Sequence, residues 1–195
     1  MSSSCTRHAL VAYEAGDTRR ARVESFVQQV FADRHGACIT SFMPTLLALE
    51  GRGGKVCGVV GFRNAHAAPL FLERYLAQPI ETELQRRTGQ SIGRERIVEV
   101  GNLASLSCRA AFHLVAILPR VLIERGNQWI VFTATSAVRD ILEKFHAPMI
   151  ELASASRDRV GNAEEWGRYY DCDPRIMAGY LADGLRLRLT AARSK

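Results

Sequence analysis

A single carboxylate, Glu99, interrupts the apolar segment RIVEVGNLAS, residues 96–105. The surrounding residues are typical of a strand buried on both faces, where an unpaired carboxylate is costly. Burial raises the pKa of a carboxyl group and can make it a general base near neutral pH, whereas an arginine neighbour keeps it charged and structural. The sequence leaves both interpretations open: Glu99 is a catalytic base, or it forms an ion pair, for which the candidates are Arg96, Arg139 and Arg168.

Gly101 follows Glu99 by two residues and weakens the strand, which favours a bulge or the close approach of a ligand or another backbone. In a sheet that splays apart there, free main-chain groups would bind an amide-containing ligand such as a pantetheine arm. The next segment leads into a helix, whose first amides form an anion site unless the serines only cap it. These features predict a ligand-binding segment made of Asn102, Leu103, Ala104, Ser105, Ser107 and Arg109.

Other reactive side chains give weaker signals. Cys108 lies at a predicted helix start, where a thiol pKa is lowered, but no histidine partner can be assigned to it. The five histidines have no metal-like spacing, and we predict no metal site. An aromatic loop, WGRYYDCDP, forms either a pocket wall or a packed anchor; the candidate substrate-pocket residues are Arg139, Trp166, Tyr169 and Tyr170.

The elements that must position these residues alternate along the chain. Apolar residues at helical spacing predict a first helix over 17–32, capped by Asp17, and a glycine-rich connection predicts a hairpin over 45–62. Pro79 separates two helical pieces, and Asp173 and Pro174 predict the start of a last helix. The remaining predicted strands cover 8–15, 96–105, 128–135 and 147–155, and the remaining helices 70–76, 80–87, 108–125, 136–146 and 171–189.

This order predicts an α/β fold in one domain spanning residues 1–195, with flexible ends at 1–6 and 190–195. The sheet is expected to be mixed: antiparallel at its N-terminal end, with parallel or splayed central strands at 96–103 and 128–134, and flanked by helices. Alternation of this kind matches the GNAT acyltransferase superfamily, although many α/β folds share it.

Composition places the chain among soluble globular proteins, with 47% hydrophobic and 24% charged residues. No apolar run is long enough to span a bilayer and no secretory signal is visible, so we expect a cytoplasmic protein without stable membrane insertion. The five scattered cysteines are expected to be free thiols. A net charge of +6 suits an anionic partner, yet no helix-turn-helix or aromatic-basic motif favours nucleic acid.

Seven blocks of sequence together resemble the bacterial family called thermostable hemolysin: SFMPTLLAL, PLFLERYL, PIE, RIVEVGNLAS, WIVFTAT, WGRYYD and PRIMAG. They cover about residues 40–179 and occur in the order found in that family. The family in turn resembles GNAT acyltransferases and, within them, the acyl-homoserine-lactone synthases.

The resemblance implies an acyltransferase that moves a fatty acyl group from acyl-CoA or an acyl carrier protein to the amine of a small metabolite. It implies no tightly bound cofactor, and it makes Glu99 the general base by position. The usual phosphate-binding signature is replaced by SLSCRAA, which leaves room for an acyl carrier protein, whose acidic surface suits a basic enzyme. The alternatives are a non-catalytic acyl-ligand or protein-binding module, or a directly membrane-active hemolysin acting through its LRLRL tail. Oligomeric state is not predicted.

Overall fold

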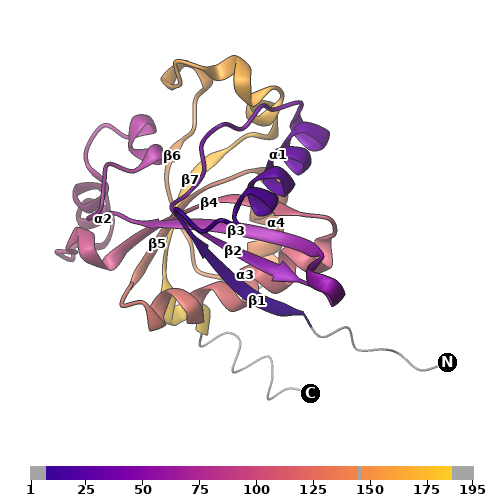
Figure 1. Ribbon diagram of the computed structural model, residues 1–195. Coiled ribbons are helices and arrows are strands. Elements are labelled where there is room, and N and C mark those ends of the chain that lie inside the picture. The colour runs from indigo at the N-terminus through magenta and orange to yellow at the C-terminus, as the bar shows by residue number, and fades with distance from the viewer. Residues whose placement is uncertain (1–7, 145, 186–195) are drawn as a thin grey trace.

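A seven-stranded mixed sheet organises the protein, whose computed structural model describes residues 8–144 and 146–185. The strand order is β1-β2-β3-β4-β5-β7-β6, and every neighbouring pair is antiparallel except β4–β5, which is parallel. The predicted mixed α/β class, with β4 and β5 in the centre, is therefore confirmed (Figure 1). The strands are β1 (Ala9–Glu14), β2 (Thr45–Glu50), β3 (Val56–Asn64), β4 (Ile97–Ser105), β5 (Trp129–Ala134), β6 (Ile150–Ser154) and β7 (Arg175–Tyr180).

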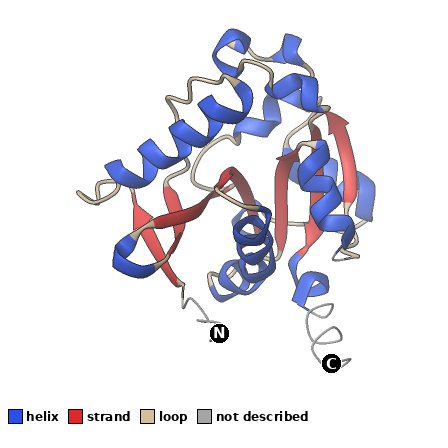
Figure 2. Ribbon diagram, turned by 90° about the vertical axis from the view of Figure 1, so that its right-hand side faces the viewer, coloured by secondary structure: helices blue, strands red, loops and turns tan. Residues whose placement is uncertain are grey.

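Helices cover both faces of the sheet, and Figure 2 shows the strands in two groups on either side of α3, which is seen end-on. The first, α1, buries residues at helical spacing, among them Val23, Val27 and Val30, against one face. The longest, α3, buries Leu114, Leu118 and Leu122 against the opposite face. The helices are α1 (Ala21–His35), α2 (Ile80–Thr88), α3 (Cys108–Glu124) and α4 (Ser136–Lys144). None of the helices in the described ranges is long and apolar enough to cross a membrane.

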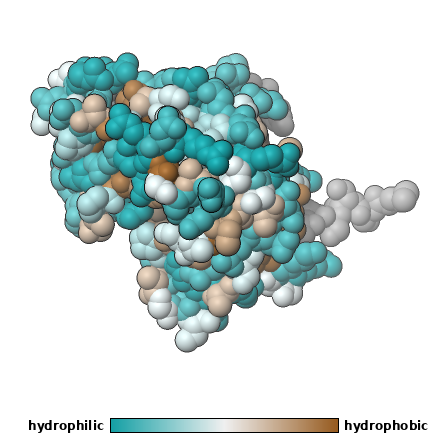
Figure 3. Space-filling view, turned by 90° about the horizontal axis from the view of Figure 1, so that it is seen from above, coloured by the Kyte–Doolittle hydropathy of each residue, from teal (hydrophilic) through white to brown (hydrophobic). Residues whose placement is uncertain are grey.

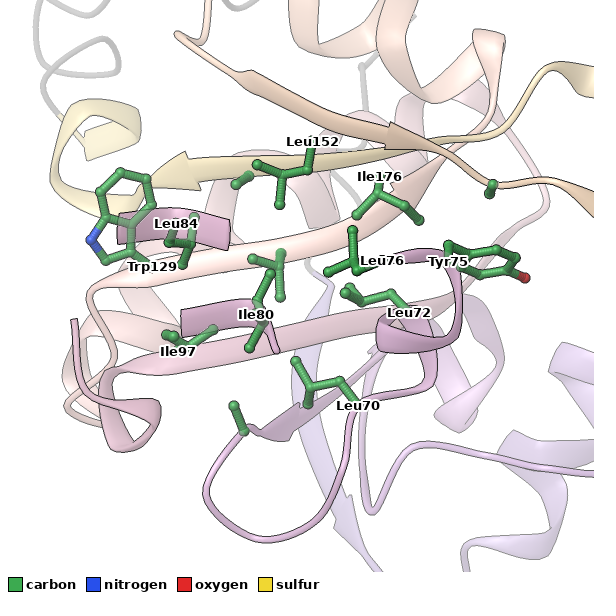
Figure 4. Packing of buried hydrophobic residues seen from close by; sticks show 14 of the residues in the cluster. Leu70, Leu72, Tyr75, Leu76, Ile80, Leu84, Ile97, Trp129, Leu152 and Ile176 are labelled. Atoms are coloured by element: carbon green, nitrogen blue, oxygen red, sulfur yellow. The ribbon is translucent and has the colours of Figure 1, made fainter. Parts of the chain in front are cut away.

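The face that carries α1 has two separate hydrophobic clusters. One lies under α1, and the other lies under the segment between β3 and β4, where Leu70, Leu72 and Leu76 pack with Ile97 and Ile176 (Figure 4). The first predicted helical piece of this segment is a 3₁₀ turn, Phe71–Tyr75, and the second is α2, which begins directly after Pro79. Glu99 of β4 bonds to this segment, as described below.

Two helix predictions are wrong. The first helix begins at Ala21, not Asp17: residues 18–20 form a turn, in which the Asp17 carboxylate bonds the amide and the guanidinium of Arg19, and the N-cap position is Arg20. The predicted last helix is replaced over Arg175–Tyr180 by β7, which lies between β5 and β6. Asp173 adopts a positive φ of 47° and its carboxylate binds Arg175 and Arg139, so it ends the preceding turn and caps no helix.

Strand β7 forms because it is buried on both faces. Ile176 packs in the cluster of one face and Met177 in that of the other, and both edges of the strand are hydrogen-bonded. A helical turn follows only at 181–185, while the predicted flexible ends and most of the LRLRL tail lie outside the described residues.

Candidate active site

The two central strands part in the middle of the sheet. Strands β4 and β5 pair from Ile97 opposite Trp129 to Val100 opposite Phe132, and their C-terminal residues do not pair. The predicted splay is therefore present. It leaves main-chain groups of both strands free to bind a ligand, because each unpaired strand edge carries an unsatisfied row of N–H and C=O groups.

A bulge in β4 accompanies the splay. Val59 of β3 pairs with Ala104 and Gly61 with Gly101, so that Asn102 and Leu103 together face one residue of β3. Asn102 has a positive φ of 49°, a conformation that asparagine tolerates better than most residues, and its Oδ1 accepts a hydrogen bond of 2.8 Å from the amide of Met43. The bulge expected beside Gly101 thus begins one residue later.

Gly101 allows the Met43 side chain to approach β4 closely. A Cβ at this position would lie 2.7 Å from Cε of Met43, closer than real side chains approach. The group that approaches this glycine is therefore the side chain of Met43, from the loop between α1 and β2, and not a second backbone as the sequence suggested.

A largely apolar cavity of about 330 Å³ occupies the splay, a volume within the range of small-molecule sites. On the α1 side it is lined by Phe31, Met43, Phe71 and Trp166, among others, and on the opposite side by residues of α3, of α4, of the loop between α4 and β6, and of 180–184 at the end of β7. Viewed from above, apolar side chains show between the hydrophilic ones that dominate this surface (Figure 3). The lining on the α3 and α4 side consists mainly of small and aliphatic residues: Ala111, Val115, Ala116, Leu118, Pro119, Val138, Ile141, Leu142, Met149 and Leu181.

Glu99 lines this cavity although it is only 3% exposed. Its Oε2 accepts a hydrogen bond of 2.9 Å from the amide of Phe71, and its Oε1 one of 2.8 Å from the amide of Leu72. Burial raises the pKa of Glu99 above its ordinary value, while the two amides and the guanidinium of Arg63 act in the opposite direction. The carboxylate is thus held by donors and is also desolvated at the cavity wall.

The cationic partner of Glu99 is Arg63, whose Nη2 lies 3.3 Å from Oε2 of Glu99. None of the predicted partners Arg96, Arg139 and Arg168 forms this pair, and that part of the prediction is wrong. Arg63 is the direct cross-strand neighbour of Glu99 on β3, 36 positions earlier in the chain, and only the register of β3 on β4 brings the two together.

Aromatic rings form the wall of the cavity on the α1 side. The ring of Trp166 lies 5.4 Å from that of Phe71 and 5.2 Å from that of Tyr169, and all three side chains line the cavity. The Tyr75 hydroxyl lies 2.7 Å from that of Tyr170, within hydrogen-bond distance. Tyr170 itself lies behind this wall and does not line the cavity.

His35 and Cys172 lie beside these rings and also line the cavity. The Sγ of Cys172 is 3.9 Å from Nδ1 of His35, and the imidazole packs edge-on against Tyr169. Burial, with a smaller effect of Arg34 and Arg168, lowers the pKa of His35 below its ordinary value. The neutral imidazole is therefore favoured here at neutral pH.

The structure brings together six of the residues proposed from sequence and separates five others. Those that line the cavity are Glu99, Asn102, Leu103, Ser105, Trp166 and Tyr169. Those that do not are Ala104, Ser107, Arg109, Arg139 and Tyr170.

The five outlying residues have other contacts or positions. Ala104 is buried in the cluster under α1, and Arg109 is exposed at the start of α3. Ser107 caps α3 by accepting a hydrogen bond of 3.2 Å from the amide of Ala110, the alternative left open for the serines. Arg139 bonds to the carbonyl of Ala134 and to Asp173.

Sequence reasoning missed several lining residues, among them Arg34, His35, Met43, Arg63 and Cys172. Arg63 carried a signal, because it is a charged residue near the end of the apolar strand VCGVVGFRN. The others lie in helix ends and loops, whose contacts depend on how distant segments fold against the sheet.

Solved structures with this fold include several enzymes that make acyl conjugates. The acyl-homoserine lactone (AHL) synthase LasI superposes with a TM-score of 0.62 at 11% identity, covering 90% of this chain and 91% of its own. FeeM, an N-acyl amino acid synthase from uncultured soil microbes, superposes with a TM-score of 0.63 at 15% identity, covering 94% of this chain and 95% of its own. MesI, a CoA-dependent acyl-homoserine lactone synthase, superposes with a TM-score of 0.59 at 15% identity, covering 95% of this chain and 94% of its own.

At these identities the likeness establishes the fold, which is that of GNAT-like acyltransferases. No curated protein sequence matches the chain. The family model described as thermostable hemolysin, in contrast, matches residues 13–185, nearly the whole chain. The protein therefore belongs to the thermostable hemolysin family.

Proposed function

We propose that the protein is an N-acyltransferase that moves a fatty acyl group from a thioester of CoA or of an acyl carrier protein to the amine of a small metabolite. The observation that carries this proposal is the apolar cavity that passes between β4 and β5, where both strands have unpaired edges. An extended pantetheine arm needs such edges to satisfy its amides, and a fatty chain needs a cavity lined by aliphatic side chains.

The transfer requires a bond between the amine nitrogen and the thioester carbonyl carbon, cleavage of the carbon–sulfur bond, and removal of a proton from the nitrogen. The leaving sulfur departs as a thiolate and takes up a proton to become the free thiol. Main-chain amides at the bulge, near Asn102 and Leu103, are the donors we assign to the carbonyl oxygen as it gains negative charge. Preorganised donors of this kind typically contribute a few kcal/mol to the transition state.

Glu99 is the group we assign to accept the amine proton. It lines the cavity, and its desolvation raises its pKa, which strengthens it as a base. Oε1 accepts one hydrogen bond and keeps a further lone pair, whereas Oε2 accepts one and also faces Nη2 of Arg63. The same carboxylate therefore has a structural contact and a free acceptor site.

The phosphate end of the donor is assigned to the exposed start of α3, where Ser107 and Arg109 lie. The aliphatic side of the cavity, formed by α3 and α4, is assigned to the acyl chain. MesI is named as CoA-dependent and FeeM as a synthase of N-acyl amino acids, and both names support acyl transfer in general.

Mass spectrometry tests the proposal directly. The pure protein is incubated with acyl-CoA and acyl carrier protein thioesters, from octanoyl to palmitoyl, together with a mixture of metabolite amines. Release of free thiol together with an N-acyl product is expected. Binding of the thioester without thiol release would show a non-catalytic acyl-ligand module, and leakage of vesicles by the protein alone would show a directly lytic one; either result contradicts the proposal.

A further inference from the structure

Arg63 lies between the cavity and the surface. Its side chain lines the apolar cavity and also an open groove formed by residues 15–18, 20, 21, 24, 42, 44, 67 and 68. Its side chain is 24% exposed, so the guanidinium is accessible from the groove, yet its Nε is buried. Arg63 therefore lies where the groove and the cavity adjoin.

The guanidinium of Arg63 has unused donors. A guanidinium carries five N–H donors in a planar fork. In the described part of the chain, Nη2 approaches Glu99 at 3.3 Å and Sδ of Met43 at 3.8 Å, and buried Nε has no hydrogen-bond partner. Because Nε is buried, the donors that a ligand can reach are those of Nη1 and Nη2, and Nη1 makes no hydrogen bond within the described residues.

The cavity lining carries more positive than negative charge, which favours an anionic ligand. The charged side chains among its described lining residues are Arg34, Arg63 and Glu99. Arg34 donates a hydrogen bond of 2.9 Å to the carbonyl of Ser105, and the Glu99 carboxylate is stabilised by two backbone amides. Arg63 is thus left with capacity for a second anion, and a carboxylate fits the planar guanidinium fork best.

We propose that the acyl acceptor carries a carboxylate next to its amine, as an amino acid does, and that Arg63 binds this carboxylate. This inference rests on the proposed function and specifies its acceptor. With the carboxylate on Arg63, an α-amine lies within reach of Glu99, because the two side chains are cross-strand neighbours on one face of the sheet. The ammonium group then meets the Glu99 carboxylate and loses one proton to it before attack on the thioester; the second proton leaves the nitrogen as the carbon–sulfur bond breaks and is taken up by the departing thiolate.

Binding of a product analogue tests the carboxylate site without requiring turnover. The probes for calorimetry are N-dodecanoylglycine, its uncharged amide, and dodecanoate. We expect the wild-type protein to bind the acid about tenfold or more tightly than the amide, the range of one charge-assisted hydrogen bond. Equal binding of acid and amide, no binding of either, or binding of dodecanoate as tight as that of the acylglycine would overturn the proposal.

Substitutions of Arg63 test whether this residue causes the preference for the acid over the amide. Arg63→Gln is expected to remove the preference for the acid, and Arg63→Lys, which keeps the charge but not the fork, to retain part of it. Arg96→Gln is the control, because Arg96 is 55% exposed, pairs with Glu95 and does not line the cavity. Thermal unfolding verifies that each variant is folded. If Arg63→Gln does not fold, the comparison of Arg63→Lys with the wild-type protein provides the test. An unchanged preference in a folded Arg63→Gln protein would contradict the assignment.

Turnover separates this inference from the proposed function. Amino acids and their amides are compared as acceptors with one acyl thioester. If the wild-type protein prefers the amino acids, and Arg63→Gln loses this preference because its KM for the amino acid is raised, the result supports both proposals. Equal use of acids and amides supports acyl transfer and overturns the carboxylate site. If no amine is acylated while the acylglycine still binds in an Arg63-dependent way, the proposed function fails and the carboxylate site remains.

Discussion

Arg63 and Glu99 lie directly opposite each other on the antiparallel strands β3 and β4, with Nη2 of Arg63 3.3 Å from Oε2 of Glu99. The same carboxylate accepts hydrogen bonds from the amides of Phe71 and Leu72. One buried side chain thus connects two strands with the segment that crosses above them. Loss of either partner of such a buried pair is costly, because the other charge remains desolvated.

Glu99→Gln is expected to reduce both stability and activity. A glutamine keeps one acceptor oxygen, but its amide nitrogen would face a backbone N–H or Arg63 in place of the second oxygen. We expect a loss of about 1–3 kcal/mol in the free energy of unfolding from the unsatisfied donors. Removal of the proton acceptor should slow acyl transfer by roughly 100-fold to 10,000-fold. Urea denaturation and turnover measure the two effects separately.

Glu95→Gln is the matched control for Glu99→Gln, because Glu95 is 64% exposed and lies two positions before β4. Neither quantity should change in this variant. If Glu99→Gln is destabilised as expected while its folded fraction transfers acyl groups at the normal rate, Glu99 is structural and another group is the base.

Substitutions of Asn102 separate the backbone conformation of the bulge from its side-chain contact. Glycine loses the hydrogen bond to the Met43 amide but adopts the positive φ readily, whereas alanine loses the bond and also resists that conformation. Asn102→Ala should therefore be less stable than Asn102→Gly by about 1–2 kcal/mol in denaturant titrations. Equal stability of the two variants would show that the bulge relaxes in alanine.

Val115→Phe is expected to shorten the acyl chain that the protein accepts. Val115 is half-buried on α3 and lines the aliphatic side of the cavity, so a larger side chain fills space assigned to the acyl chain. Loss of room for two methylenes lowers kcat/KM for palmitoyl thioesters about tenfold or more, with little effect on octanoyl thioesters. Ile117→Phe on the same helix, outside the lining, is the control, and the same shift in that variant would contradict this location for the chain.

His35 should make the protein less stable in acid. Its pKa is below the ordinary value of 6.5 in the folded state, so the unfolded chain binds more protons as the pH falls below 6.5. The contribution of His35 to stability is therefore full above 6.5 and declines below it. In His35→Gln the fall in the free energy of unfolding between neutral and acidic pH should be smaller. His66→Gln, at an exposed position, should keep the wild-type slope.

Local patterns in the sequence predict most of the elements, because apolar periodicity, glycine pairs and Pro79 act over a few residues. They predict α3, the β2–β3 hairpin and the bulge near Gly101. They fail at β7, where a short apolar run after Pro174 fits a helix or a strand equally well. The segment forms a strand because β5 and β6 hydrogen-bond the backbone groups along both of its edges.

For the site, the sequence by itself determined that Glu99 lies on a buried strand next to a weak point in the sheet, since both features follow from residues within a few positions. The tertiary structure decided what surrounds it: the amides of Phe71 and Leu72, the guanidinium of Arg63, and a cavity lined by α1, α3 and α4. These contacts join segments far apart in the chain. Register and packing bring them together, and no local pattern encodes either one.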